Sequence, residues 1–312
     1  MPRSEFEYID WIRSRTGAAE GVVIPPGDDM GAIAAPPAGE PVLVTTDMIA
    51  EGTDFLRPEA SPERIGYKAM AVSLSDVAAM AALPTGAVAA VMLPTDADDA
   101  LTEGLYAGMR RAADAFGCPL IGGDTNAWAG KLVLCTTVFA RPGGVAPVRR
   151  SGARPGDVVA VTGTLGGSIL GRHLDFVPRI REARTLAGLV RLHAMMDLSD
   201  GLAGDIRHIC RESGAGAVLD AAALPVSDAA GTLAERTGKP AWRHALEDGE
   251  DFELLFTLPP EDWAKLAAAV PFAAGVTAIG VIDSAPGVRL RHPDGRVEPL
   301  ACRGWEHLRG GH

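Results

Sequence analysis

The chain has 312 residues, a length that suits two domains better than one small core. Apolar residues make up 47% of the chain, which is enough for packed cores and excludes a disordered protein. The formal net charge of -11 argues against a broad basic surface for nucleic acid.

The first half of the chain mixes helical and strand patterns. Apolar spacing predicts helices over 3–15, from Ser61-Pro62 toward Leu83, and over 98–116. Strands are expected over 41–46, 86–93, 118–121 and 131–140, and a loop over Gly21–Met30. The third strand is expected to end at a Gly122-Gly123 turn.

The composition changes to Pro, Gly and Arg at Arg141–Gly156, so we expect domains over 1–145 and 146–312. The second half predicts strands over 157–162, 194–198, 216–220 and 252–258, with further strands at the end. It predicts helices up to about 194, over 200–213 and over 260–269. Because no strict βαβ rhythm appears, two α+β domains are expected.

No apolar run reaches about 18 residues, and the N-terminus does not resemble a signal peptide. We therefore expect a cytoplasmic protein with no membrane partner. The four cysteines lack C-x-x-C spacing, which argues against a zinc site or a disulfide framework.

Five short acidic clusters stand out from the acidic background. They are Gly27-Asp28-Asp29, Thr45-Thr46-Asp47, Leu74-Ser75-Asp76, Gly122-Gly123-Asp124-Thr125 and Asp197-Leu198-Ser199-Asp200. Hard cations such as Mg²⁺ prefer carboxylate oxygens, often shared with substrate phosphates. Carboxylates gathered in one site repel each other unless cations compensate them. Together the clusters predict a site for Mg²⁺.

Two of the clusters permit a structural interpretation as well. Ile65, Ala69 and Val72 mark the inner face of one helix, and Asp76 is the next position on that face. Either Asp76 is paired or binds metal there, or the helix changes register near Ser73. Likewise, Asp197 and Asp200 either share a metal or phosphate site or only cap a helix.

The residues of two further segments give no clear indication of a binding site. Gly163–Ser168 follows a strand and could cradle phosphate, but it lacks the P-loop lysine and fits a tight turn equally well. Glu247–Asp251 reads as a solvated acidic loop before a strand.

The ordered series of motifs resembles the thiamine-monophosphate kinases of the aminoimidazole-ribonucleotide-synthetase-like superfamily. The matching segments are GDDMGAI, VTTDMIAEGTDF, IGYKAMAVSLSDVAAMAALP, LIGGDTN, RRSGARPGDVVAVTGTLGGS, MMDLSDGLAGDIRHI and ALEDGEDFELLFT. The resemblance extends from about Glu5 to Trp305. It implies two α+β domains, the second an α/β sandwich, and a homodimer formed through the N-terminal sheet. It also implies ATP-dependent phosphorylation of thiamine monophosphate to thiamine diphosphate, assisted by several Mg²⁺ ions.

The resemblance also implies roles for individual residues. Those matching metal positions are Asp29, Thr45, Thr46, Asp47, Asp76, Asp124, Asp197 and Asp200. Those matching ATP contacts are Tyr106, Gly123, Asp124, Arg150 and Ser199. Glu250 and Trp305 match positions that touch the thiamine moiety, and Asp54 stands where the family has a substrate-binding His.

The chain departs from the family pattern around these positions. Ser73 replaces the Asn of AVNLSD, and Asn126-Ala127 removes the Arg that follows GGDTT. Asp248 replaces the first Gly of G-G-E-D, and Gly167 replaces the Asp of TGxxGDS.

The acceptor phosphate has a second pKa of about 6, so it is largely a dianion at neutral pH and needs no general base. We expect in-line transfer, with Asp47, Asp76 and Asp124 holding metals that bridge ATP. Asp29 and Asp197 are expected to hold metals near the acceptor, and Arg150 to bind phosphate oxygens.

Two rival functions are compatible with the same fold. One is another ATP-using enzyme of the superfamily, a ring-closing synthetase or a maturation factor, although no cysteine lies in a suggestive motif. The other is a non-catalytic nucleotide-binding relative, suggested by Asp54 and Asn126.

Overall fold

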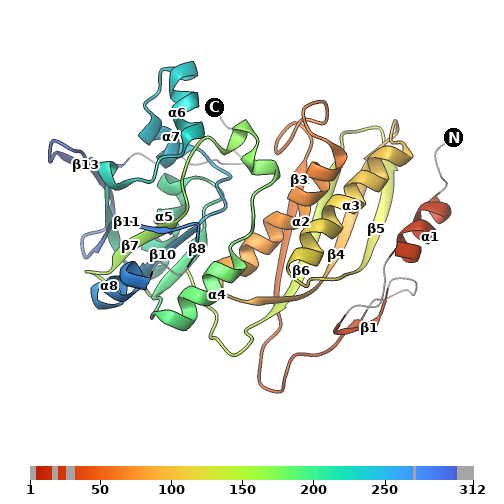
Figure 1. Cartoon of the computed structure of the whole chain (residues 1–312), viewed down its shortest axis with the longest axis horizontal. Coiled ribbons are helices and arrows are strands. Elements are labelled where there is room, and N and C mark those ends of the chain that lie inside the picture. The colour runs from red at the N-terminus through yellow and green to blue at the C-terminus, as the bar shows by residue number, and fades with distance from the viewer. Residues whose placement is uncertain (1–4, 16–19, 26–31, 270–271, 301–312) are drawn as a thin grey trace. The chain divides into compact units, whose positions relative to one another are not determined.

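The computed structural model describes residues 5–15, 20–25, 32–269 and 272–300 (Figure 1). The chain divides into two compact units. The chain passes from unit 1 to unit 2 mainly after Gly144. Two short segments, Ala78–Ala81 and Leu174–Val177, belong to the opposite unit from their sequence neighbours, so no single cut separates the units.

Unit 1 is built on a four-stranded sheet in the order β3-β6-β4-β5. The strands are β3 (Leu43–Ala50), β4 (Leu83–Pro94), β5 (Leu120–Trp128) and β6 (Val133–Arg141). Helices α2 (Pro62–Ala79) and α3 (Asp99–Ala115) cover one face of it (Figure 1). The unit also contains α1 (Glu5–Arg15) and the paired strands β1 (Val22–Ile24) and β2 (Ala32–Ile33).

The two faces of this sheet differ in cover. One row across the four strands consists of Asp47, Thr136, Ala89 and Gly123. This row faces the helices, because Thr136 Oγ1 donates to the carbonyl of Ala69 in α2 at 2.7 Å. The next row consists of Met48, Cys135, Ala90 and Asp124. Because side chains alternate along a strand, this row lies on the other face, where Val44 and Met48 are 60% and 65% exposed.

Helices α2 and α3 touch through glycines. A Cβ on Gly66 would lie 2.0 Å from the carbonyl oxygen of Leu105, and one on Gly108 would lie 1.9 Å from that of Glu63. Real Cβ atoms do not approach oxygen this closely, so both positions require glycine for the helix backbones to meet.

Unit 2 is built on a seven-stranded sheet in the order β13-β12-β9-β11-β7-β10-β8. Strands β9 and β12 are parallel, and the other neighbours are antiparallel. The strands are β7 (Val158–Thr162), β8 (Ala194–Asp197), β9 (Gly216–Asp220), β10 (Leu254–Leu258), β11 (Val276–Asp283), β12 (Gly287–Arg291) and β13 (Val297–Pro299). The helices are α4 (Ile180–Leu189), α5 (Leu202–Ser213), α6 (Asp228–Thr237), α7 (Ala241–Glu247) and α8 (Pro260–Ala269).

Both faces of the central strands of unit 2 are covered. Neighbouring residues Val159 and Ala160 point to opposite faces, and both are fully buried. Leu202 and Ile206 of α5 pack in the same core cluster as Val159. The two-domain α+β fold and the layered second domain expected from the sequence are therefore confirmed.

Several expected element boundaries are wrong. Strand β3 continues to Ala50, so Asp47 lies within a strand and not after it. Strand β5 runs through Gly122-Gly123 to Trp128, because it pairs along its length with β4. Helices α6 and α7 had no predicted counterpart, and β1 lies in the expected loop.

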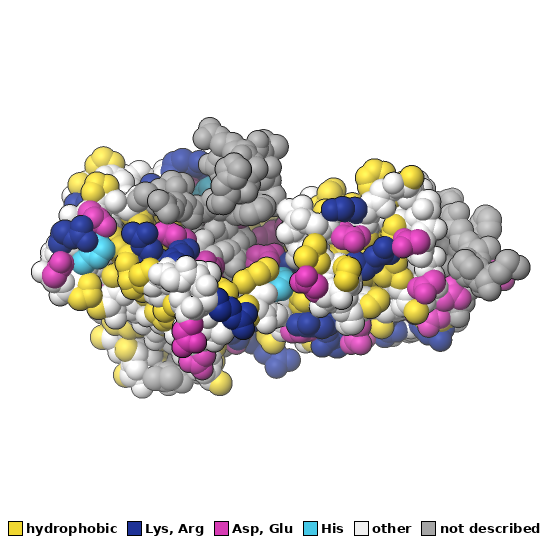
Figure 2. All heavy atoms as spheres, turned by 90° about the horizontal axis from the view of Figure 1, so that it is seen from above, with side chains coloured by type: hydrophobic (Ala, Val, Ile, Leu, Met, Phe, Trp, Pro, Cys, Tyr) yellow, Lys and Arg dark blue, Asp and Glu magenta, His cyan; other side chains and the backbone are white. Residues whose placement is uncertain are grey.

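The distribution of charged side chains on the surface fits the expectation from the net charge that no broad basic area is present. On the face drawn in Figure 2, basic and acidic side chains are interspersed and form no continuous basic stripe. Within the described ranges, no helix has the length and apolar character needed to span a bilayer.

We predict that Gly66→Ala lowers the free energy of unfolding by about 1–3 kcal/mol, because the added methyl group forces α2 and α3 apart. Thermal and urea denaturation would measure the loss. The matched control is Gly188→Ala in α4, where a Cβ meets open space, and it should keep or slightly raise the stability. Equal stabilities of the two variants would contradict the assigned helix contact.

Candidate functional site

A polar cluster lies between β3 and α2 in unit 1. Thr45 and Asp47 alternate on the helix-facing side of β3, and Ser73 and Asp76 face them from α2. Thr45 Oγ1 donates to Asp76, and Ser73 Oγ donates to an Asp47 carboxylate oxygen at 2.9 Å. The cluster thus joins two predicted metal ligands, Asp47 and Asp76, with hydroxyl groups beside them.

The Asp47 carboxyl is destabilised in its charged form. Burial first, and the neighbouring Asp76 second, raise its pKa to about 6, while the Ser73 hydrogen bond acts in the opposite direction. Asp47 has no salt bridge with a basic group among the described residues. An external cation would offset the repulsion between the two carboxylates.

Helix α2 is continuous from Pro62 to Ala79, which decides between the two interpretations of Asp76. The helix does not change register at Ser73, and Asp76 stays on the inner face, half-buried and hydrogen-bonded to Thr45. Ser73 is fully buried. As the residue replacing the family Asn, it still supplies a donor to Asp47.

Two predicted site residues of the same sheet point away from this cluster. The Thr46 hydroxyl lies on the open face, 2.9 Å from that of Thr137. Asp124 is exposed on the same open face, on the edge strand farthest from β3. A single sheet therefore does not bring Asp124 and Asp47 together. Gly123, beside Asp124, faces the helices, and a Cβ there would lie 2.1 Å from the Ala89 carbonyl oxygen.

Tyr106 and Asp54 are engaged within unit 1. The Tyr106 ring is buried and packs edge-on against Trp11, with centroids 5.4 Å apart. The Asp54 carboxylate accepts from the backbone N–H of Ala50 at 2.7 Å, and its carbonyl accepts from buried Lys68. Asp54 thus closes the turn after β3. Asp29 and Trp305 lie outside the described residues.

The predicted residues of unit 2 lie at the end of β8. Asp197 is the last residue of that strand and is 3% exposed. Ser199 and Asp200 form the turn into α5, and the Ser199 carbonyl accepts from the Glu250 N–H at 2.7 Å. Arg150 is exposed, and its charge acts on Asp205 and His208 of α5.

Asp205 and His208 were missed by the sequence reasoning. Asp205 is 1% exposed, and one of its oxygens accepts from the Asp200 N–H at 3.2 Å. Burial first, then Asp200 and Asp197, raise the Asp205 pKa well above its usual value. The signal was present, because Leu202, Asp205, Ile206 and Ile209 share the buried face of α5 at helical spacing.

The Gly163–Ser168 turn is held by carboxylates. The Gly166 N–H donates to both Asp251 oxygens at 3.0 and 2.8 Å, and the Gly167 N–H donates to Asp248 at 3.1 Å. These are the backbone groups that a phosphate cradle would need. The structure therefore favours the tight-turn interpretation of this segment.

The acidic segment before β10 is also not a solvated loop. Asp251 is 2% exposed, and burial raises its pKa to about 8. Glu250 has a positive φ of 63°, a costly conformation for a residue with a side chain. Its N–H donates to Ser199, and its carbonyl accepts from Ser168 Oγ at 2.7 Å. The backbone of Glu250, the predicted thiamine contact, is thus held by hydrogen bonds to both its N–H and its carbonyl.

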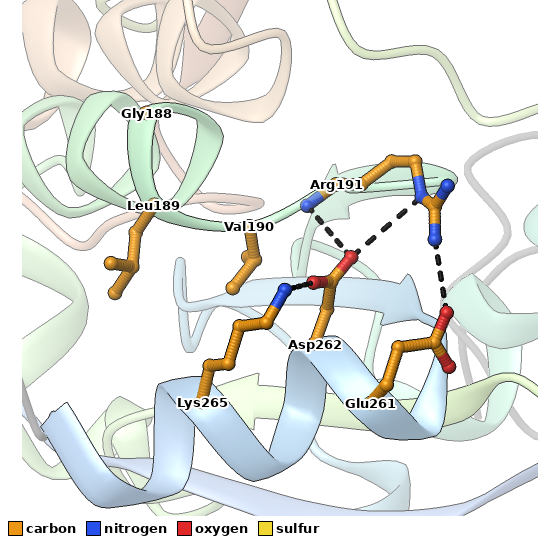
Figure 3. Close-up of a pocket in the computed structure, with 7 residues that line it drawn as sticks. All are labelled: Gly188, Leu189, Val190, Arg191, Glu261, Asp262 and Lys265. Atoms are coloured by element: carbon orange, nitrogen blue, oxygen red, sulfur yellow. Dashed lines mark hydrogen bonds and ion pairs between the residues drawn. The ribbon is translucent and has the colours of Figure 1, made fainter.

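One surface depression of unit 2, of about 420 Å³, contains none of the predicted site residues (Figure 3). It lies between the end of α4 and the start of α8. Its charged side chains bind one another: Arg191 pairs with Glu261 at 3.0 Å, and Lys265 pairs with Asp262 at 2.7 Å. This depression is not a candidate for the active site.

Comparison with known proteins agrees with the two units. Residues 27–141 match the family "AIR synthase related protein, N-terminal domain", and residues 154–292 match the corresponding C-terminal domain. The thiamine-monophosphate kinase of Rhodopirellula baltica is 36% identical over 309 residues, with 97% of each chain covered.

Two solved structures are similar over nearly their whole length. The thiamine-monophosphate kinase of Stenotrophomonas maltophilia has a TM-score of 0.79 at 32% identity and covers 96% of this chain and 99% of its own. A structure described as AaThiL complexed with AMPPCP and TMP has a TM-score of 0.76 at 30% identity and covers 97% and 96%. The chain therefore belongs to the thiamine-monophosphate kinases of the AIR synthase related family.

Proposed function

We propose that this enzyme transfers the terminal phosphoryl group of ATP to thiamine monophosphate, giving thiamine diphosphate and ADP. The observation that carries the proposal is the Asp47–Asp76 cluster, whose repelling carboxylates lie on a fold shared with kinases of this activity. A relative with 30% identity binds AMPPCP and TMP, which supports a nucleotide and a thiamine phosphate as the two ligands.

The donor atoms of this cluster suit Mg²⁺. They are carboxylate oxygens of Asp47 and Asp76 with hydroxyl groups alongside, and hard cations prefer such oxygens. Asp47 and Asp76 would hold Mg²⁺ in unit 1, and Asp197 and Asp200 would hold it in unit 2. Bound Mg²⁺ would neutralise phosphate charge and align the reacting oxygens.

The remaining steps fall to the chain and the substrates. The acceptor phosphate is already largely a dianion at neutral pH, so no side chain has to remove a proton. Arg150 is exposed beside the Asp200–Asp205 turn, where its guanidinium can bind phosphate oxygens. The fixed backbone of Glu250 would orient the thiamine moiety. We infer direct in-line transfer from this division of roles.

Two of the four cysteines, Cys118 and Cys210, are unsuited to act as the thiol nucleophile of a synthetase. Burial raises the pKa of Cys118 to about 12 and that of Cys210 to about 11. Both thiols are therefore protonated and poor nucleophiles at neutral pH.

We also propose that the open face of the unit 1 sheet forms a homodimer. Val44 and Met48 are exposed there, and Asp124 and Thr46 share that face. Pairing of two such faces would bury the apolar residues and place Asp124 where a second copy can use it.

We predict that Asp76→Asn lowers kcat by about 10²-fold or more, because the charge that binds the cation is lost while the Thr45 contact can persist. A coupled ADP-release assay with thiamine monophosphate, and with free thiamine in parallel, would measure it. The control is Asp114→Asn, an exposed acid on α3 that pairs with Arg110. A wild-type rate for Asp76→Asn would remove the proposed role of this cluster.

We predict that Asp47→Asn, without divalent cations at pH 8, has a Tm about 2 °C or more above that of the wild type. The folded pKa of about 6 exceeds the ordinary value of 3.8. The folded state therefore binds the proton more tightly, and wild-type stability falls as pH rises from about 4 to about 6.

Thermal scans at pH 4 and pH 8 would check this, and the advantage of the Asn variant should shrink at pH 4. Added Mg²⁺ should raise the Tm of the wild type more than that of the variant. If the Tm difference between Asp47→Asn and the wild type were the same at pH 4 and at pH 8, the Asp47 pKa would not be raised in the folded protein.

We predict that Val44→Asp combined with Met48→Asp converts the protein from dimer to monomer in light scattering after gel filtration, because charged groups cannot be buried unpaired in an apolar interface. Val177→Asp, at another exposed apolar residue, is the control and should leave the mass unchanged. A wild-type protein with the mass of one chain would refute the dimer.

A further inference from the structure

Asp200, Asp205 and His208 form a cluster of possible metal ligands in unit 2. One carboxylate oxygen of each Asp and one imidazole nitrogen of His208 all lie within 4.8 Å of one another. Asp200 and His208 are half-buried, and Asp205 is buried. Ligands spaced in this way can meet a single divalent cation.

A second observation points to a ligand at this place. Asp205 Oδ1 is buried and has no hydrogen-bond partner in the described part of the chain, although Oδ2 accepts from the Asp200 N–H. A buried carboxylate oxygen without a partner is costly. Protonation would remove the charge but would leave an O–H donor equally unmatched. A bound cation would compensate the negative charge of Asp205 and coordinate the Oδ1 atom that lacks a partner.

Two basic side chains lie near the cluster. Burial is the largest effect lowering the His208 pKa, and Arg150 and Arg211 both act on His208 as well. Arg211 Nη2 lies 3.5 Å from His208 Nδ1, but the Arg211 side chain is 71% exposed and can turn away. The carboxylates of Asp197, Asp200 and Asp205 outnumber these two guanidinium groups.

We propose that Asp205 and His208 complete, with Asp200, a divalent-cation site at the start of α5. The mixed oxygen and nitrogen donors favour Mn²⁺ relative to Mg²⁺, since Mg²⁺ prefers oxygen ligands alone. The site deepens the proposed function, because it extends the cation site of Asp200 by two residues. Its test is metal binding without substrates, so it can succeed or fail independently of kinase activity.

The experiment titrates MnCl₂ into the EDTA-stripped full chain without nucleotide and follows free Mn²⁺ by electron paramagnetic resonance. Asp205→Asn keeps an oxygen for the Asp200 N–H but loses the charge, and it should weaken Mn²⁺ binding by about 10-fold or more. His208→Gln should weaken Mn²⁺ more than Mg²⁺ and abolish the ¹⁴N modulation in pulsed spectra. Glu212→Gln, an exposed change on the same helix, should leave both unchanged.

Wild-type affinity in both Asp205→Asn and His208→Gln would overturn the site, and so would a wild-type protein that binds no Mn²⁺ or shows no ¹⁴N modulation. Circular dichroism checks that each variant folds. If Asp205→Asn does not fold, the half-exposed His208 still decides the question. An inactive wild type that binds Mn²⁺ with ¹⁴N modulation would refute the kinase proposal and support the site.

Discussion

The cost of burying a carboxylate without an opposite charge governs both units. One buried acid of unit 2 is neutralised by basic side chains. Glu253 is fully buried and binds Arg172, as well as Arg179 at 2.7 and 2.8 Å. Asp47 and Asp205 are also withdrawn from water, yet their nearest charged neighbours include other carboxylates. Protons or cations would stabilise such an arrangement, and cations are what the proposed phosphoryl transfer calls for.

The two units bring their carboxylates together with different secondary-structure elements. In unit 1 a strand and a helix face each other, so alternate residues of β3 meet successive turns of α2 and hydroxyl groups separate the acids. In unit 2 the acids follow one another through the turn from β8 into α5. That turn is pinned by the segment before β10, since Leu198 and Ser199 accept from the N–H groups of Phe252 and Glu250. The positive φ of both donors stores strain at this place, as functional segments often do.

Periodicity predicted most of the helices and strands because their apolar faces are regular. It failed where contacts between strands, and not apolar spacing, determine the structure. Gly122 and Gly123 look like a turn, but pairing with β4 holds them in a strand. Apolar spacing also did not show that Thr46 and Asp124, which the family resemblance groups with Asp47, lie on the other face of the sheet, where the two-residue repeat of the strands places them. Asp205 carries the same signal as Asp76, a charge on a buried helical face, and could have been found by the same rule.

Three of the departures of this chain from the family pattern, Ser73, Gly167 and Asp248, take part in hydrogen bonds with carboxylates. Ser73 keeps a donor for Asp47. Gly167 and Asp248 are two separate departures in the sequence, yet the N–H of one donates to the carboxylate of the other. A carboxylate missing from the turn is thus supplied by the facing segment. His244 Nδ1 lies 2.9 Å from the same Asp248 oxygen, which helps to fix the orientation of this carboxylate. Substitutions that keep hydrogen bonds in this way favour an enzyme under functional constraint over a relative that has lost catalysis.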